Sequence, residues 1–76
     1  MKAILEFNLP EDQIEYQMVN DSSKMFSTLW DMKQWLRAQV KYAPDEMSKD
    51  AYDTFEECRE KLNELLIDNS LDLEQL

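Results

Sequence analysis

The sequence predicts a mainly α-helical protein, in which a short N-terminal β-strand is followed by three helices, the second and third packed antiparallel. Three observations support this fold class. Apolar side chains recur every three or four positions along most of the chain, its first residues alternate instead, and two prolines with no glycine leave long stretches free to be helical. We expect one small domain over residues 1–76.

The first element is predicted over residues 2–8, KAILEFN, where apolar and polar side chains alternate with Ile4 as the exception. A strand needs a hydrogen-bonding neighbour, and no other segment alternates convincingly, so we expect its partner to come from another chain. An alternative stays open, in which the segment is extended but unpaired and packs Leu5 and Phe7 on the helices.

The first helix is predicted over residues 10–20, because a proline is tolerated in a first turn and the acids after it favour the positive end of the helix dipole. The stretch NDSS at 20–23 is expected to end it, since asparagine takes the left-handed conformation readily and Ser22 can cap the next helix. The second helix is predicted over residues 22–43, ending before Pro44.

The third helix is predicted over residues 48–68, with Ser48 or Asp45 as its N-cap and Asn69 at its end. The side chains spaced along one side of it are Tyr52, Phe55, Arg59, Leu62 and Leu66. Residues 69–76 alternate leucine with acids, and this tail is expected to dock loosely or to fray.

Trp30 and Trp35 are five positions apart, so their rings point about 140° apart on a helix and one core cannot cover both. The stripe expected to form the core comprises Met25, Leu29, Met32, Leu36, Val40 and Ala43. Apolar residues cover more of this helix than so small a protein can bury, so we expect a homo-oligomer. Its candidate interface comprises Leu5, Phe7, Trp35 and Tyr42. In the alternative, one tryptophan lies in the core and the other under the tail leucines.

The net charge of −9 is unevenly distributed. Residues 44–76 hold eleven acids and three bases, whereas residues 24–42 hold four bases and one acid. A strongly acidic surface repels nucleic acid and anionic membranes, so direct binding to either is not expected. The sequence shows neither a signal peptide nor a transmembrane run, and we expect a cytoplasmic protein.

A row of cations beside an aromatic ring is the candidate ligand site. Lys33, Arg37 and Lys41 recur at a spacing of four, next to Trp30. Such a row can bind an anion, and a stacking ring would add what a nucleotide needs. In the alternative, the row pairs with an acidic face of the third helix that comprises Asp53, Glu56, Glu57, Glu60 and Glu64.

Catalytic chemistry is thinly represented in the sequence. Glu56 and Glu57 are adjacent and point about 100° apart on a helix, so they cannot act together as acid and base. Phosphate-cradling loops need glycine, which the chain lacks. The lone cysteine, Cys58, is expected to be a buried apolar residue. We therefore expect no enzyme, no metal site and no cofactor.

The segments LEFNLPED, LWDMKQWLR with VKY, and YDTFEECREKLNELL, together with the leucine–acid tail, resemble small acidic proteins of unknown activity encoded by tailed bacteriophages and prophages. The likeness spans nearly the whole chain. It implies a protein that acts in the cytoplasm of an infected bacterial host. As a class, such proteins resemble counter-defence factors that sequester a nucleotide-derived signal. Two alternatives are an acidic inhibitor of a host defence protein, in the manner of a DNA mimic, and a structural or assembly protein of the phage.

Overall fold

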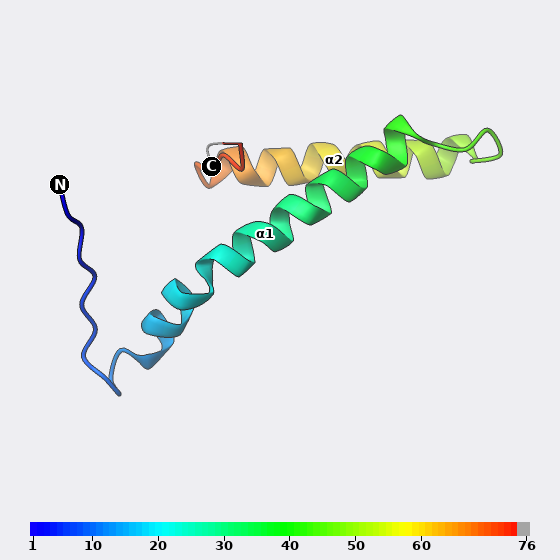
Figure 1. Ribbon diagram of the computed structural model, residues 1–76. Coiled ribbons are helices and arrows are strands. Elements are labelled where there is room, and N and C mark those ends of the chain that lie inside the picture. Colours follow the sequence, from blue (N-terminus) through cyan, green and yellow to red (C-terminus); the bar gives the residue numbers. More distant parts are fainter. Residues whose placement is uncertain (75–76) are drawn as a thin grey trace.

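The computed structural model describes residues 1–74 and consists of two helices joined by a short loop (Figure 1). Helix α1 spans Gln13–Lys41 and α2 spans Lys49–Asp68. The expectation of a mainly α protein is confirmed. The predicted order of one strand and three helices is wrong, because the described residues contain two helices and no strand.

Helix α1 runs unbroken through the NDSS stretch at 20–23, so the predicted boundary between the first two helices is wrong. Polar side chains here are satisfied within the helix. The Ser22 hydroxyl donates to the carbonyl oxygen of Val19 at 2.7 Å, and the Gln17 amide donates to the Asp21 carboxylate at 3.0 Å. Each of these residue types costs a helix at most about 0.7 kcal/mol relative to alanine, too little to stop it.

The start of α1 lies three residues later than predicted, because a tight turn precedes it. The Asp12 carboxylate accepts a hydrogen bond from the backbone N–H of Asn8 at 2.9 Å. The backbone N–H of Asp12 donates in return to the carbonyl oxygen of Asn8 at 2.8 Å. This reciprocal pair reverses the chain and sets the direction in which the N-terminal segment leaves.

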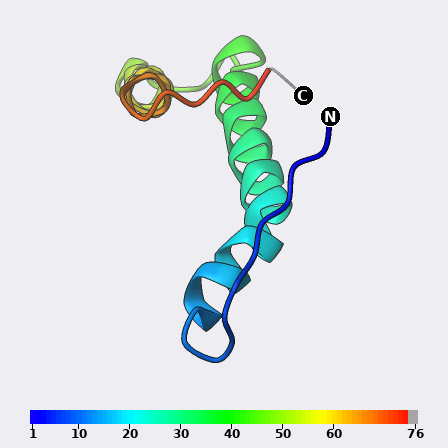
Figure 2. The same ribbon diagram turned by 90° about the vertical axis from the view of Figure 1, so that its left-hand side faces the viewer.

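The N-terminal segment, residues 1–8, is extended, and from the turn toward residue 1 it leads away from α1 (Figure 1). In the view of Figure 2 the same segment passes in front of α1. Within the described chain no other segment offers it a hydrogen-bonding edge, and the predicted strand at 2–8 is wrong. Phe7 is half-buried, with its ring 5.6 Å from that of Tyr16 in an edge-on contact. Leu5 is exposed, so the unpaired alternative describes Phe7 but not Leu5.

Helix α2 matches the third predicted helix to within a residue. The Ser48 hydroxyl caps it by accepting the backbone N–H of Ala51 at 3.1 Å, as expected for an N-cap serine. At its other end the Asn69 side chain donates to the carbonyl oxygen of Leu65 at 2.8 Å. The helix runs back along the C-terminal half of α1 in the opposite direction (Figure 1).

The hydrophobic core is small. Leu36 of α1, Leu66 of α2 and Leu73 of the tail are the apolar residues that are buried in the described part of the chain. The Trp35 ring meets that of Phe55 edge-on, with centroids 5.7 Å apart. The tail thus docks through Leu73 rather than fraying, although residues 75 and 76 of the predicted tail lie outside the described range.

Two predictions about buried residues are wrong for the same reason. Met25 and Met32 of the expected core stripe are 48% and 50% exposed, and Cys58 is exposed as well. Helix α2 covers only one edge of the apolar arc of α1, and within the described residues nothing covers the outer side of α2. A single helical hairpin therefore leaves most of its apolar surface in water.

The overall shape is far from spherical. The radius of gyration is 17.6 Å, against about 11 Å for a compact domain of this length. The accessible surface is 6756 Å², against about 4,900 Å² for a folded monomer of the same mass. The N-terminal half of α1 projects beyond α2 without a covering element (Figure 1).

Candidate anion-binding site

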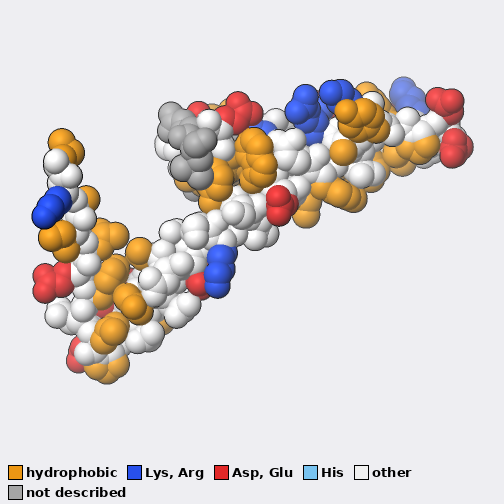
Figure 3. Space-filling model, in the orientation of Figure 1, with side chains coloured by type: hydrophobic (Ala, Val, Ile, Leu, Met, Phe, Trp, Pro, Cys, Tyr) orange, Lys and Arg blue, Asp and Glu red, His pale blue; other side chains and the backbone are white. Residues whose placement is uncertain are grey.

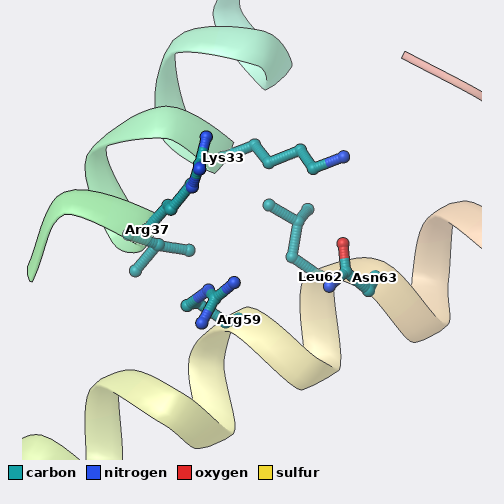
Figure 4. Close-up of a pocket in the computed structure, with 6 residues that line it drawn as sticks. Lys33, Arg37, Arg59, Leu62 and Asn63 are labelled. Atoms are coloured by element: carbon teal, nitrogen blue, oxygen red, sulfur yellow. The ribbon is translucent and has the colours of Figure 1, made fainter. Parts of the chain in front are cut away.

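Three cations from two helices line one small cavity (Figure 4). Lys33 and Arg37 come from α1 and Arg59 from α2, and we call these three residues the basic cluster. Leu36, Leu62 and Asn63 complete the lining. The cavity measures about 30 Å³, which is room for one or two water molecules. The cluster therefore surrounds a space that fits part of a small ligand.

The positions of these side chains follow from helical spacing. Lys33 and Arg37 are four residues apart, so they share a face of α1, beside the buried Leu36. Arg59 lies on the inner side of α2, three residues before Leu62, and is half-buried. In Figure 4 the Lys33 side chain extends from α1 over Leu62 on α2.

Sequence reasoning identified Lys33 and Arg37 but did not assign Arg59 to the site. Its position among Phe55, Leu62 and Leu66 on the inner side of the helix was visible in the spacing. A cation within an apolar helix stripe is the sequence feature from which Arg59 could have been assigned to the site.

The charges of the basic cluster are only partly neutralised. The Lys33 ammonium lies 3.4 Å from the Glu74 carboxylate, and the Arg59 guanidinium lies 3.5 Å from that of Glu56, one turn away on the same helix. Arg37 has no ion-pair partner among residues 1–74. Partly exposed pairs of this length contribute at most about 1 kcal/mol each.

The acidic face of α2 does not neutralise the basic row. Within the described chain, no lysine or arginine of α1 pairs with a carboxylate of α2. The exposed members of this face are Asp53, Glu57, Glu60 and Glu64, and only Glu56 is half-buried. The cross-helix salt bridges of the alternative interpretation are therefore not formed in the described part of the chain.

The other two candidate ligand residues lie apart from this cavity. Lys41 places its ammonium 5.4 Å from the centre of the Tyr42 ring, and both line an open hollow of about 160 Å³ that Arg37 also borders. Trp30 lines a different hollow with Leu73 of the tail. The structure thus joins Arg37 to Lys41 and separates both from the indole.

The candidate interface residues do not form one patch. Trp35 and Tyr42 are exposed near the C-terminal end of α1, whereas Leu5 and Phe7 belong to the N-terminal segment. The length of α1 between them is about 30 Å at 1.5 Å per residue. In Figure 3 hydrophobic side chains gather over the N-terminal segment and again along the hairpin, and several basic side chains lie together on the upper side of the hairpin.

Within residues 1–74, neither helix carries the long apolar stretch that crossing a bilayer requires. No protein-family model, curated protein or solved structure matches the chain, and no family is assigned to it.

Proposed function

We propose that the chain is a non-enzymatic binding protein that holds a small oxyanion at the basic cluster and works as a homo-oligomer. The observation that supports this most is the meeting of Lys33, Arg37 and Arg59 at one cavity in a chain of net charge −9. Like charges that face each other across a helix interface repel, and a bound anion would remove that repulsion. The proposed ligand is the phosphate group of a nucleotide-derived signal.

The three side chains differ in what they offer to a phosphate. Arg37 and Arg59 present planar guanidinium groups whose paired N–H donors match two oxygens at once. Lys33 adds a point charge on a long stem, which can move from Glu74 to a ligand at little cost because their ion pair is long and exposed. Together they would supply charge from both helices.

The size of the cavity limits which part of a ligand it can hold. Pockets that enclose drug-sized molecules measure about 300–1,000 Å³, whereas this cavity measures about 30 Å³. A phosphate oxygen fits, and a nucleoside does not. We assign the rest of the ligand to the neighbouring hollow beside Lys41 and Tyr42, because Tyr42 is 72% exposed. A base could stack on the face of the Tyr42 ring that the Lys41 ammonium does not cover.

The setting comes from the resemblance to small phage proteins. In an infected bacterial cytoplasm, sequestering a nucleotide-derived signal would make the chain a counter-defence factor. A second candidate is an acidic inhibitor of a host defence protein, favoured by the row of exposed carboxylates on α2. The two roles use different sides of α2, so substitutions can separate them.

The test is a titration of the full chain with inorganic phosphate, pyrophosphate, ADP-ribose and cyclic nucleotides, measured by calorimetry. We expect at least one of them to bind, and Arg37→Gln to weaken binding by about tenfold or more, since a charge-assisted hydrogen bond contributes roughly 1.5–3 kcal/mol. Lys24→Gln is the matched control, because Lys24 is an exposed cation of α1 that does not line the cavity.

Equal weakening in both variants would mean that binding is non-specific attraction to positive charge. Absence of binding by every probe, together with capture of one host protein that is lost in Glu57→Gln/Glu60→Gln, would favour the acidic-inhibitor role instead. Circular dichroism of each variant checks that the helices are intact.

A further inference from the structure

We infer that α1 pairs with α1 of a second copy along an exposed apolar seam. The seam comprises Ile14, Met18, Met25, Met32 and Trp35, each between 48% and 74% exposed. This inference rests on the homo-oligomer in the proposed function and adds to it the surface, the partner element and the direction of pairing. Four of the five residues were not among the interface candidates from sequence, and two of those four were expected in the core.

The spacing of the seam is that of a helix–helix contact. Steps of four, seven, seven and three residues keep all five side chains within an arc of about 100°. Met18, Met25 and Met32 repeat at intervals of seven, which is the period of residues that meet a partner helix along its whole length. Helix α2 packs on the adjoining arc that begins at Leu36 and touches the seam at Trp35, whose ring meets Phe55 edge-on. Trp35 is still 52% exposed, so this end of the seam keeps half of its surface.

The exposed area of the chain is what a stable pair requires. The surface of 6756 Å² exceeds that of a compact monomer by about 1,900 Å². A standard interface removes about 800 Å² from each partner, and interfaces of permanent homodimers remove more. A second copy on the seam would bring the exposed surface per chain toward the ordinary range.

Charge also selects α1 as the contact. Helix α1 carries four bases and three acids, whereas the whole chain has a net charge of −9. Helix α2 carries seven acids and three bases. Two copies that met through α2 would repel strongly, and two that meet through α1 repel less, because the acidic helices then lie farther from the contact.

The order of side chains along the seam favours an antiparallel pair. With Met25 at the two-fold axis, Met18 lies opposite Met32 of the other copy, and Ile14 lies within one residue of the position opposite Trp35. The largest side chain of the seam thus lies beside a smaller one and not beside its own copy. Asp21 is the one acid on this arc. An antiparallel pair separates the two Asp21 carboxylates by about 12 Å along the axis, whereas a parallel pair would set them face to face.

An antiparallel pair also keeps the two α2 helices apart. Each α2 packs on the C-terminal half of its own α1 (Figure 1). Reversing one α1 against the other therefore places the two acidic helices at opposite ends of the assembly. Each then lies toward the uncovered N-terminal half of the other chain, where the apolar surface is largest.

The first test is the mass of the full chain by light scattering across micromolar concentrations. We expect twice the chain mass of 9.1 kDa. Met25→Lys should raise the dimer dissociation constant at least tenfold, whereas Ile67→Lys, the same charge change at an apolar residue that is 75% exposed outside the seam, should leave it unchanged. A wild-type monomer at high micromolar concentration, a larger assembly, or equal effects of the two variants would overturn the inference.

The second test determines whether the two α1 helices pair parallel or antiparallel. It uses variants that cross-link the dimer, so it does not depend on variants that weaken it. In a Cys58→Ser background, Met25→Cys should cross-link two copies by oxidation, because Met25 faces its own copy. Met18→Cys should cross-link poorly. Equal cross-linking of both would overturn the antiparallel arrangement. Phosphate binding measured on the same samples is a separate result, so a failure at the basic cluster and a failure at the seam can be told apart.

Discussion

Arg59 is the residue whose removal best separates a binding site from a structural ion pair. Replacing it with methionine keeps an unbranched stem beside Leu62 and removes one of the three charges that line the cavity. We expect Arg59→Met to hold or raise the free energy of unfolding, by up to about 1 kcal/mol, and to abolish phosphate binding. Urea denaturation with and without phosphate measures both.

The control for Arg59→Met is Lys61→Met, because Lys61 forms the same kind of one-turn ion pair, with Glu64 at 3.7 Å, on the exposed side of α2. Lys61→Met should leave phosphate binding intact. A loss of more than about 1 kcal/mol in Arg59→Met alone would exceed what the ion pair with Glu56 can contribute. It would show that Arg59 stabilises the packing of the hairpin, which would count against a ligand role.

Leu73 is the most buried side chain of the described chain, and the docking of the tail depends on it. Truncation to alanine should lower the free energy of unfolding by about 2–3 kcal/mol, since a buried leucine is replaced by a cavity. Leu71→Ala, two residues earlier and half-exposed, should cost well under that. Equal losses, read from urea midpoints, would mean that the tail is not held by a specific contact.

At the scale of elements, the start of α2 offers a clean test of local stability. Ser48→Ala removes the hydroxyl that accepts the Ala51 N–H and should cost about 1 kcal/mol. Ser27→Ala, in the middle of α1, should instead stabilise the protein by a few tenths of a kcal/mol, because alanine is the better helix former. Thermal melts by circular dichroism compare the two, and a loss in both would contradict the capping argument.

The sequence was sufficient to predict α2 because its signals are local and mutually consistent. A serine cap and an asparagine end bracket a stretch with one apolar side. The helix end predicted at 20–23 is wrong because polar residues end a helix only where the chain beyond it makes contacts that offset the lost helical hydrogen bonds. Within the described chain, a separate first helix would have no element to pack against. The side chains of Ser22 and Asp21 form their hydrogen bonds within α1 instead.

The candidate site could be predicted only in part, because local spacing shows which side chains share one helix but not which helices meet. Lys33 and Arg37 share a helix face at fixed spacing, which can be read from one segment. The membership of Arg59 depends on how α2 is shifted along α1, and that shift is set by tertiary packing around Leu36 and Leu66. The alternation at 2–8 was too short to decide between a strand and an extended segment without a partner.

At the scale of the whole molecule, the described chain buries little apolar surface for its length. The core of the described hairpin is three leucines, and small domains with so little buried area depend on association. We therefore expect the melting temperature to rise with protein concentration between about 1 and 100 μM, as it does when folding and dimerisation are coupled. Calorimetry at several concentrations measures this, and a constant melting temperature would indicate a self-sufficient monomer.

The uneven charge, with a nearly neutral α1 in an acidic chain, has a consequence for behaviour in salt. Pairing of the seam brings two negative bodies together, so raising the ionic strength should screen their repulsion and strengthen the dimer. The same ions compete for the basic cluster and should weaken phosphate binding. One salt titration would thus change dimerisation and phosphate binding in opposite directions. Low ionic strength favours the phosphate-bound chain, and high ionic strength favours the dimer.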